Sequence, residues 1–343
     1  MLVQIVLFDG FDLLDALAPY EVFCAAEMYS GGAIRVELVT AEGARSVSSG
    51  LNGLQITASG GIDLERAGII LVPGASGEVS GDGPNSVPAI LSRASETKLT
   101  PLMGEALGKP ELTVATVCGG SLLLAMGGLL DGRHAVTNHL GMDVLGATGA
   151  IPVRARVVDD GNLVTGGGVT SGLDVALYLV ERELGPRIAS EVEKLFEYER
   201  GGTVWQQRGM IPIIEKSSSG SAEETLLQVR PDELAEARAT DIVFEGAWHV
   251  VITTPIGKQH VALNISSENG HVRGIAVQGD EVVEFVDPVI QNNRLIWSQR
   301  VTKPMRLNLK FEVTVHGNEM TGIAKAGMLP ASKLIGERVA NQA

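Results

Sequence analysis

The stretch Leu112-Thr-Val-Ala-Thr-Val-Cys118-Gly-Gly-Ser-Leu-Leu-Leu-Ala125 decides the fold class of this chain. Its apolar, β-branched first half predicts a buried strand, and its leucine-rich second half predicts a helix. Cys118 and the two glycines after it occupy the turn between them, where glycine lets the chain turn without Cβ clashes. A thiol held over the first N–H groups of a helix is favoured as thiolate. We therefore expect Cys118 to have a lowered pKa and to act as a nucleophile.

The residues around this turn alternate short β-branched runs with longer helical patterns. Such alternation predicts an α/β fold, a doubly wound and mostly parallel sheet with helices on both faces. Strands are expected at residues 2–8, 35–40, 68–72, 112–117 and 162–166. Helices are expected at residues 15–29, 86–107, 120–130, 139–147, 171–184 and 186–199. A hairpin is expected between Arg45 and Thr57, and a further strand at residues 153–158.

The chain changes character after residue 208. Its 343 residues exceed the usual size of one hydrophobic core. The segment Glu215–Glu224 has the serine-rich composition of a linker, and a short helix is expected at residues 226–239. We predict an α/β domain at 1–208, a linker with a short helix at 209–243 and a small β-barrel at 244–343.

The barrel prediction depends on evenly spaced turn signals after residue 245. They are Pro255-Ile-Gly257, Asn269-Gly270, Gly279-Asp280, Asn292-Asn293 and His316-Gly-Asn318. This spacing favours an antiparallel barrel or sandwich of about seven or eight strands. Trp248 and Trp297 are expected in its core. The histidines of this region have no metal-ligand spacing, so no metal site is expected there.

Composition limits the partners and the compartment. The chain carries 27 basic and 41 acidic residues with no lysine or arginine run, so nucleic acid and anionic membranes are not expected partners. The apolar start, Met1 to Phe8, lacks a positive flank and is too short for a signal or spanning segment. Two cysteines, Cys24 and Cys118, cannot form a secreted disulfide framework. These features favour the cytoplasm, with Cys24 as an inert core thiol.

Three other motifs accompany the Cys118 turn in the first 208 residues. They are Phe8-Asp-Gly-Phe-Asp-Leu-Leu-Asp15-Ala-Leu-Ala-Pro19-Tyr-Glu-Val22, Leu71-Val-Pro-Gly74-Ala75 and Thr165-Gly-Gly-Gly-Val-Thr-Ser-Gly172-Leu-Asp174. Together the four resemble the DJ-1/PfpI superfamily, and within it the isonitrile hydratase branch and the amidase-like domains of some transcription regulators. The resemblance implies a flavodoxin-like fold and a homodimer. The last hundred residues are only faintly similar to lipocalin-like barrels, through Gly246-Ala-Trp248, Gly322, Gly327 and Arg338.

The resemblance also implies a reactive site. Asp15 follows the first strand, so it belongs to the same carboxyl edge of the sheet as Cys118, and in the hydratases this position holds the acid beside the nucleophile. Backbone N–H groups of the superfamily form an oxyanion-type pocket, which here would use Gly74, Ala75 and Gly119.

Two positions depart from the resembling enzymes. The family commonly has a histidine twenty residues after the cysteine, where this chain has Asn138, followed by His139. The isonitrile hydratases place threonine after the cysteine, where this chain has Gly119. Asn138, His139 and Thr170 are expected to line the site.

These residues favour a cysteine-dependent hydratase. Cys118 would attack the terminal carbon of an isonitrile and Asp15 would serve as general acid and base, giving an N-substituted formamide. The alternatives are a glyoxalase- or amidase-type enzyme and a thiol sensor or ligand-binding protein without turnover. The partner is a small-molecule electrophile, and no cofactor or metal is expected, because Gly166–Gly168 lacks the lysine of a phosphate-binding loop. The barrel would bind a hydrophobic molecule, cover the site or mediate dimer contacts.

Overall fold

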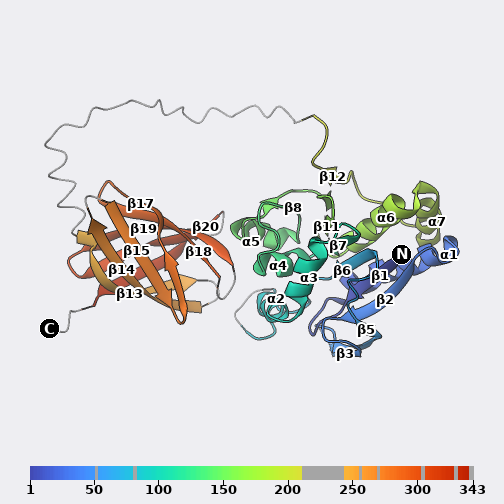
Figure 1. Cartoon of the computed structure of the whole chain (residues 1–343), viewed down its shortest axis with the longest axis horizontal. Coiled ribbons are helices and arrows are strands. Elements are labelled where there is room, and N and C mark those ends of the chain that lie inside the picture. The colour runs from blue at the N-terminus through green and yellow to red at the C-terminus, as the bar shows by residue number, and fades with distance from the viewer. Residues whose placement is uncertain are drawn as a thin grey trace.

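Two separate hydrophobic cores organise the chain in a computed structural model (Figure 1). The structure describes residues 1–50, 53–79, 83–210, 243–254, 257–268, 271–302, 306–327 and 331–339. The predicted serine-rich linker and the helix at 226–239 lie outside these residues. Among the described helices, none is both long and apolar enough to cross a membrane.

The first domain is built on an eight-stranded sheet, counted over the described residues. Its strands, in spatial order, are β12 (Trp205–Gln206), β10 (Val157–Asp159), β11 (Leu163–Gly166), β7 (Leu112–Thr116), β6 (Gly68–Val72), β1 (Leu2–Val6), β2 (Arg35–Thr40) and β5 (Gly60–Gly61). The five central strands from β11 to β2 are the five that the sequence predicts, and they pair in parallel. β1 and β6 are buried at every position because helices cover both faces of the sheet.

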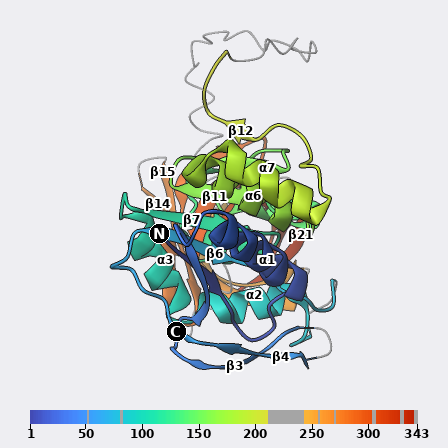
Figure 2. The same ribbon diagram turned by 90° about the vertical axis from the view of Figure 1, so that its right-hand side faces the viewer.

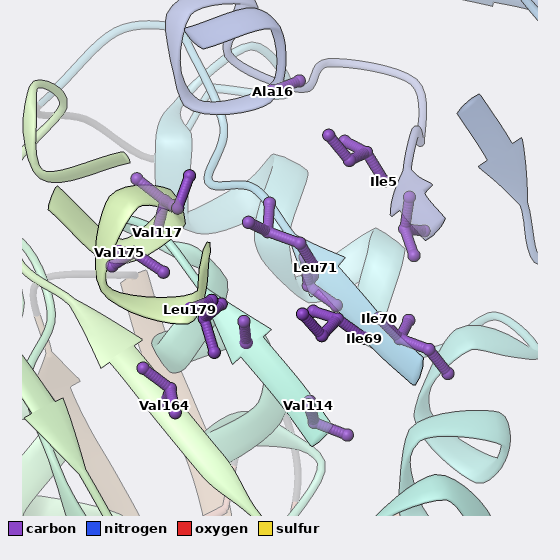
Figure 3. Packing of buried hydrophobic residues seen from close by; sticks show 14 of the residues in the cluster. Ile5, Ala16, Ile69, Ile70, Leu71, Val114, Val117, Val164, Val175 and Leu179 are labelled. Carbon is purple, nitrogen blue, oxygen red and sulfur yellow. The ribbon is translucent and has the colours of Figure 1, made fainter. Parts of the chain in front are cut away.

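Helices pack on the two faces of this sheet (Figures 1 and 2). One face carries α1 (Leu13–Tyr29), α6 (Ser171–Leu184) and α7 (Pro186–Phe196), which contact one another. The other face carries α2 (Val87–Ser95), α3 (Leu99–Leu107), α4 (Gly120–Met126) and α5 (Met142–Ala147). Figure 3 shows the core between Leu71, Val114 and Val164 of the sheet and Val175 and Leu179 of α6.

Two predicted helices differ in the structure. The expected helix at 86–107 is two helices, because the Thr97 hydroxyl donates to the Ala94 carbonyl at 2.7 Å and accepts from the Leu99 N–H at 3.2 Å. The expected helix at 120–130 ends at Met126, before Gly128 with φ +77°. The predicted hairpin forms as β3 (Arg45–Ser48) and β4 (Gln55–Ala58). A small parallel pair, β8 (His134–Ala135) with β9 (Ile151–Pro152), lies outside the main sheet.

The second domain is a nearly closed antiparallel barrel, with nine strands among its described residues. They are β13 (Gly246–Thr254), β14 (Gly257–Glu268), β15 (His271–Gln278), β16 (Glu281–Glu284), β17 (Val286–Gln291), β18 (Arg294–Val301), β19 (Leu307–His316), β20 (Glu319–Ala326) and β21 (Ser332–Arg338). Gly279-Asp280 and Asn292-Asn293 lie between consecutive strands, as predicted, and Gly317-Asn318 separates β19 from β20. Pro255, Ile256, Asn269 and Gly270 of the predicted turns lie outside the described residues. Trp248 and Trp297 are both buried, as predicted.

The barrel has more strands than the predicted seven or eight because one break carries no turn signal. β16 and β17 are separated by Phe285, whose side chain is buried and stacks on Trp297 with ring centroids 4.3 Å apart. Gly274 makes room for this ring, since a Cβ there would lie 2.4 Å from a Phe285 ring carbon. Phe285 is not a turn former by local sequence, so the break depends on packing across the barrel.

The barrel lies against the α4 and α5 side of the first domain (Figure 1). Arg300 of β18 donates to Asp131 at 3.1 Å, and the Arg306 guanidinium lies against Gly128, just after α4. Gly327, after β20, lies beside Ala147 at the end of α5. One end of the barrel therefore faces the Cys118 turn.

Candidate active site

Cys118 occupies the turn between β7 and α4 in a backbone conformation that side chains rarely adopt. Its φ is +55°, and its N–H donates to the Gly166 carbonyl of the neighbouring strand at 3.1 Å. The Thr137 hydroxyl donates to the Cys118 carbonyl at 2.6 Å. These two bonds hold a left-handed non-glycine residue in place, an arrangement that is often found at functional positions.

The glycine pair after Cys118 lets the chain turn without Cβ clashes, as predicted, although neither glycine has a positive φ. Gly119 has φ −67°, and Gly120 is helical. A Cβ on Gly120 would lie 2.2 Å from the Val72 carbonyl oxygen, and one on Gly119 would lie 3.1 Å from a Leu91 methyl. The absence of side chains lets the turn approach the end of β6, and Leu91 occupies the space where a residue-119 side chain would begin.

Asn138 contacts the thiol. Its amide nitrogen donates to Cys118 Sγ at 3.6 Å, and its amide oxygen accepts the Leu140 N–H at 3.1 Å. The second bond places Asn138 at the start of a short 3-10 helix, His139–Gly141 (η2), and fixes which end of the amide faces sulfur. Asn138 can therefore stabilise negative charge on sulfur but cannot remove its proton.

Asp15 is fully buried in the first turn of α1, next to the thiol. Its Oδ2 accepts the Gly74 N–H at 3.0 Å. Its Oδ1 is buried and has no hydrogen-bond partner among the described residues. Gly74 therefore donates to the acid in this structure and not to an oxyanion, which corrects its predicted role.

Burial governs the protonation of both groups. The pKa of the Cys118 thiol is raised to about 12, first by burial and then by the negative charge of Asp15, against the hydrogen bonds from Asn138 and the Gly119 N–H. The expectation of a lowered cysteine pKa is therefore wrong for this structure. The thiol is 9% exposed, and the helix after it has only seven residues, so desolvation exceeds the stabilisation offered by helix N–H groups.

The acid is shifted in the same direction. The pKa of Asp15 is raised to about 8, first by burial and then by the charge of Asp12. The Gly74 N–H and the Cys118 thiol oppose this rise. At neutral pH the pair is mostly a carboxylic acid beside a neutral thiol. Such an acid can donate its proton to a substrate that binds at the sulfur.

A cavity of approximately 590 Å³ opens at the thiol. On the α/β side, Cys118, Gly119, Asn138 and Ala75 are among the residues that line it, and Asp15 is not. Residues of α2 and α4 add to the wall on this side, and the barrel supplies the other side. Sequence patterns could not find these barrel residues as site residues, because nothing local in a strand tells which barrel end meets the first domain.

Two predicted lining residues lie elsewhere. His139 is exposed and does not line the cavity, so it does not replace the family histidine. The Thr170 hydroxyl accepts from Arg156 at 2.9 Å, and Thr170 does not line the cavity either. Over the described residues, no cluster of three His, Cys, Asp or Glu side chains could hold a metal ion.

The family pattern of DJ-1/PfpI proteins matches residues 1–182, more than half of the chain. The chain belongs to the DJ-1/PfpI family. Isonitrile hydratase of Pseudomonas putida is 34% identical over 198 residues, which cover 56% of this chain and 76% of that enzyme. The DJ-1/PfpI domain is also similar to the HTH-type transcriptional regulator CdhR of Pseudomonas aeruginosa, with 26% identity over 55% of this chain and 53% of the regulator.

Solved DJ-1/PfpI structures match the same region. A ThiJ/PfpI family protein of Pseudomonas syringae aligns with TM-score 0.48 and 27% identity over 59% of this chain and 76% of its own. Drosophila melanogaster DJ-1beta aligns with TM-score 0.48 and 19% identity over 58% of this chain and 98% of its own. The curated matches cover little more than half of the chain, about the length of the DJ-1/PfpI domain.

Proposed function

We propose that this protein hydrates isonitriles to N-substituted formamides, with Cys118 as nucleophile and Asp15 as general acid and base. The observation that carries the proposal is a buried carboxylic acid beside the thiol, with one oxygen that has no partner among the described residues. Similarity to an isonitrile hydratase supports the choice of substrate. Burial of the site supports a reaction sheltered from bulk water.

The first step joins the thiol to the isonitrile carbon. The carbon–sulfur bond forms while the Asp15 acid gives its proton to the same carbon, and the thiol proton passes to the carboxyl group. The product is a thioimidate, R–N=CH–S–Cys, and the carboxylic acid is restored. Because the carbon is protonated as sulfur attacks, this route does not need a free thiolate, which the raised pKa of Cys118 disfavours.

The second step uses water. Asp15 gives its proton to the imine nitrogen while water adds to the thioimidate carbon, and the resulting carboxylate takes one proton from that water. The adduct is R–NH–CH(OH)–S–Cys. Its carbon–sulfur bond then breaks as sulfur takes the proton from Asp15 and the hydroxyl proton of the adduct passes to Asp15, which releases N-substituted formamide and restores the thiol and the carboxylic acid. The Asn138 amide, 3.6 Å from Sγ, stabilises charge on the departing sulfur. The net reaction adds one water to one isonitrile.

The raised pKa of Cys118 also disfavours the alternative function of a thiol sensor. Oxidation of cysteine proceeds through thiolate, and the raised pKa of Cys118 keeps thiolate scarce at neutral pH. A glyoxalase-type reaction transfers a proton between two carbons and therefore calls for a second base. Beside the thiol, where such a base would act, this chain has Asn138, whose amide is not a base. The isonitrile reaction uses one acid only, so it fits the residues at hand.

The test is an assay of purified protein with an aryl isonitrile, following formamide by chromatography. Cys118→Ser should abolish turnover, and Asp15→Asn should lower kcat/KM by about 10²-fold or more. Cys24→Ser is the matched control, because Cys24 is half-buried in α1 outside the cavity lining and should keep wild-type rates. Turnover by Cys118→Ser at the wild-type rate would exclude the mechanism.

A further inference from the structure

We propose that the interior of the barrel is the specificity half of the Cys118 site and receives an apolar substituent of the molecule that reacts there. The inference rests on the proposed function for the identity of the reacting group. It goes beyond the proposed function in naming the substrate class: an electrophile that carries a long hydrocarbon chain.

The cavity at Cys118 continues into the barrel. Residues of both domains line this cavity, whose volume is approximately 590 Å³. This volume lies within the range of sites for drug-sized ligands and is larger than a methyl or ethyl isonitrile needs. Its apolar wall is built by Leu122 and Met126 of α4 and by Val250, Leu263, Leu309 and Phe311 of the barrel.

The side chains of β13 alternate between the inside and the outside of the barrel, and the inward-facing ones show where the cavity ends. Val250, Ile252 and Thr254 point inward and line it, with Thr254 nearest the first domain in register. The next inward position is Trp248, which is fully buried and does not line the cavity. Arg338 packs 4.1 Å above the Trp248 ring. The lumen is thus filled at its far end and continuous with the thiol at its near end.

Three glutamines of the barrel lining bond to the protein. Gln278 donates to Gln259 at 2.7 Å, and Gln299 donates to the Val283 carbonyl at 3.3 Å. Each of these three amides therefore has a hydrogen-bond partner in the protein before a ligand enters. Because a buried polar group without a partner is costly, the lumen favours hydrocarbon over polar substituents.

Contacts between the domains hold the barrel mouth over the thiol. Arg300 reaches Asp131, Arg306 lies against Gly128, and Gly327 lies beside Ala147. These contacts surround the α4 and α5 rim of the Cys118 cavity. A chain attached to an electrophile at Sγ therefore extends directly into the lumen.

The first experiment varies the substrate on the full-length protein. We expect kcat/KM for methyl, butyl and octyl isonitrile to rise with chain length, by about two- to fourfold for each methylene buried. Ala324→Trp fills the lumen from β20, where Ala324 lines the cavity, and should remove this increase with chain length. Lys325→Trp, on the exposed side of the same strand, is the matched control and should keep it.

The second experiment does not depend on hydratase activity. In a Cys24→Ser background, N-methyl, N-butyl and N-octyl iodoacetamide alkylate Cys118 with loss of iodide, and mass spectrometry gives the rates. The rate should rise with chain length in the background protein and in Lys325→Trp but not in Ala324→Trp. Ala276→Trp fills the lumen from β15 and replaces Ala324→Trp if thermal melting shows that the latter does not fold.

The outcomes separate the two proposals. Hydration of methyl isonitrile with no dependence on chain length in either assay would overturn the role of the lumen and leave the hydratase intact. Alkylation that depends on chain length, without hydration of any isonitrile, would overturn the hydratase and support the lumen as the binding site of an apolar chain.

Discussion

Burial keeps both the Asp15 carboxyl and the Cys118 thiol neutral near pH 7. Both are buried, and each pKa lies above its ordinary value for that reason first. A carboxylate beside a thiolate would place two negative charges in one desolvated pocket. Near neutral pH Asp15 therefore carries a proton that it can give to a substrate carbon.

This protonation makes stability depend on pH in a defined direction. The folded protein retains the Asp15 proton up to pH about 8, whereas the unfolded chain loses it near the ordinary value for aspartate. Between these pH values the folded state binds more protons, so wild-type stability should fall relative to Asp15→Asn by on the order of 1 kcal/mol per pH unit. Urea unfolding of both proteins from pH 4 to pH 9 measures this difference. A flat difference would show that Asp15 is ionised in the folded protein.

At the scale of elements, Gly74 is where three parts of the fold meet. It follows β6, its N–H bonds to Asp15 of α1, and its Cα lies against the Cys118 turn before α4. A Cβ at Gly74 would lie 2.6 Å from the Gly119 nitrogen and 2.7 Å from Asp15 Oδ2. The spacing of these elements is thus limited by the absence of one methyl group.

Gly74→Ala should separate the acid from the thiol. Overpacking at this junction should cost about 1–3 kcal/mol of unfolding free energy and lower kcat/KM for an isonitrile, since the contacting atoms are backbone and a held carboxyl. Gly60→Ala in β5 is the control, because a Cβ there meets nothing within 4 Å and should leave both quantities near wild type. Denaturant unfolding and the formamide assay measure the two effects. Full activity in Gly74→Ala would mean that the junction relaxes without moving Asp15.

At the scale of the whole molecule, the described residues form two cores that are joined by polar and rim contacts. The first surrounds the parallel sheet, and the second fills the closed end of the barrel around Trp248 and Trp297. Separate cores predict separate unfolding transitions. The active site, by contrast, needs both domains, since its cavity wall is shared.

Trp248→Ala should lower the stability of the barrel by about 3–5 kcal/mol, because it leaves a void under Arg338. Scanning calorimetry should then show one transition moved to lower temperature and the other unchanged. Trp205→Ala is the counterpart in β12 of the first domain, where Trp205 stacks on His134, and should move the other transition. A single transition moved by both variants would show that the domains unfold as one unit.

Local patterns in the sequence predict the succession of strands and helices along the first domain and the turns of the barrel. Short β-branched runs bounded by turn signals favour buried strands, and Gly, Asn and Pro signals act locally. The sequence also identified Cys118 and Asp15 as neighbours, because both follow strands at the same sheet edge. The roles of these residues and the predicted homodimer stay predictions.

The pKa values at the site and the residues that line its cavity result from the tertiary structure. The pKa of Cys118 depends on how deeply the turn is buried and on the charge of Asp15, which lies 103 positions earlier in the sequence. The break at Phe285 depends on a ring that enters space left by Gly274. The apolar wall above the thiol depends on which end of the barrel meets α4 and α5. Each of these results from contacts between residues distant in sequence, which no local pattern records.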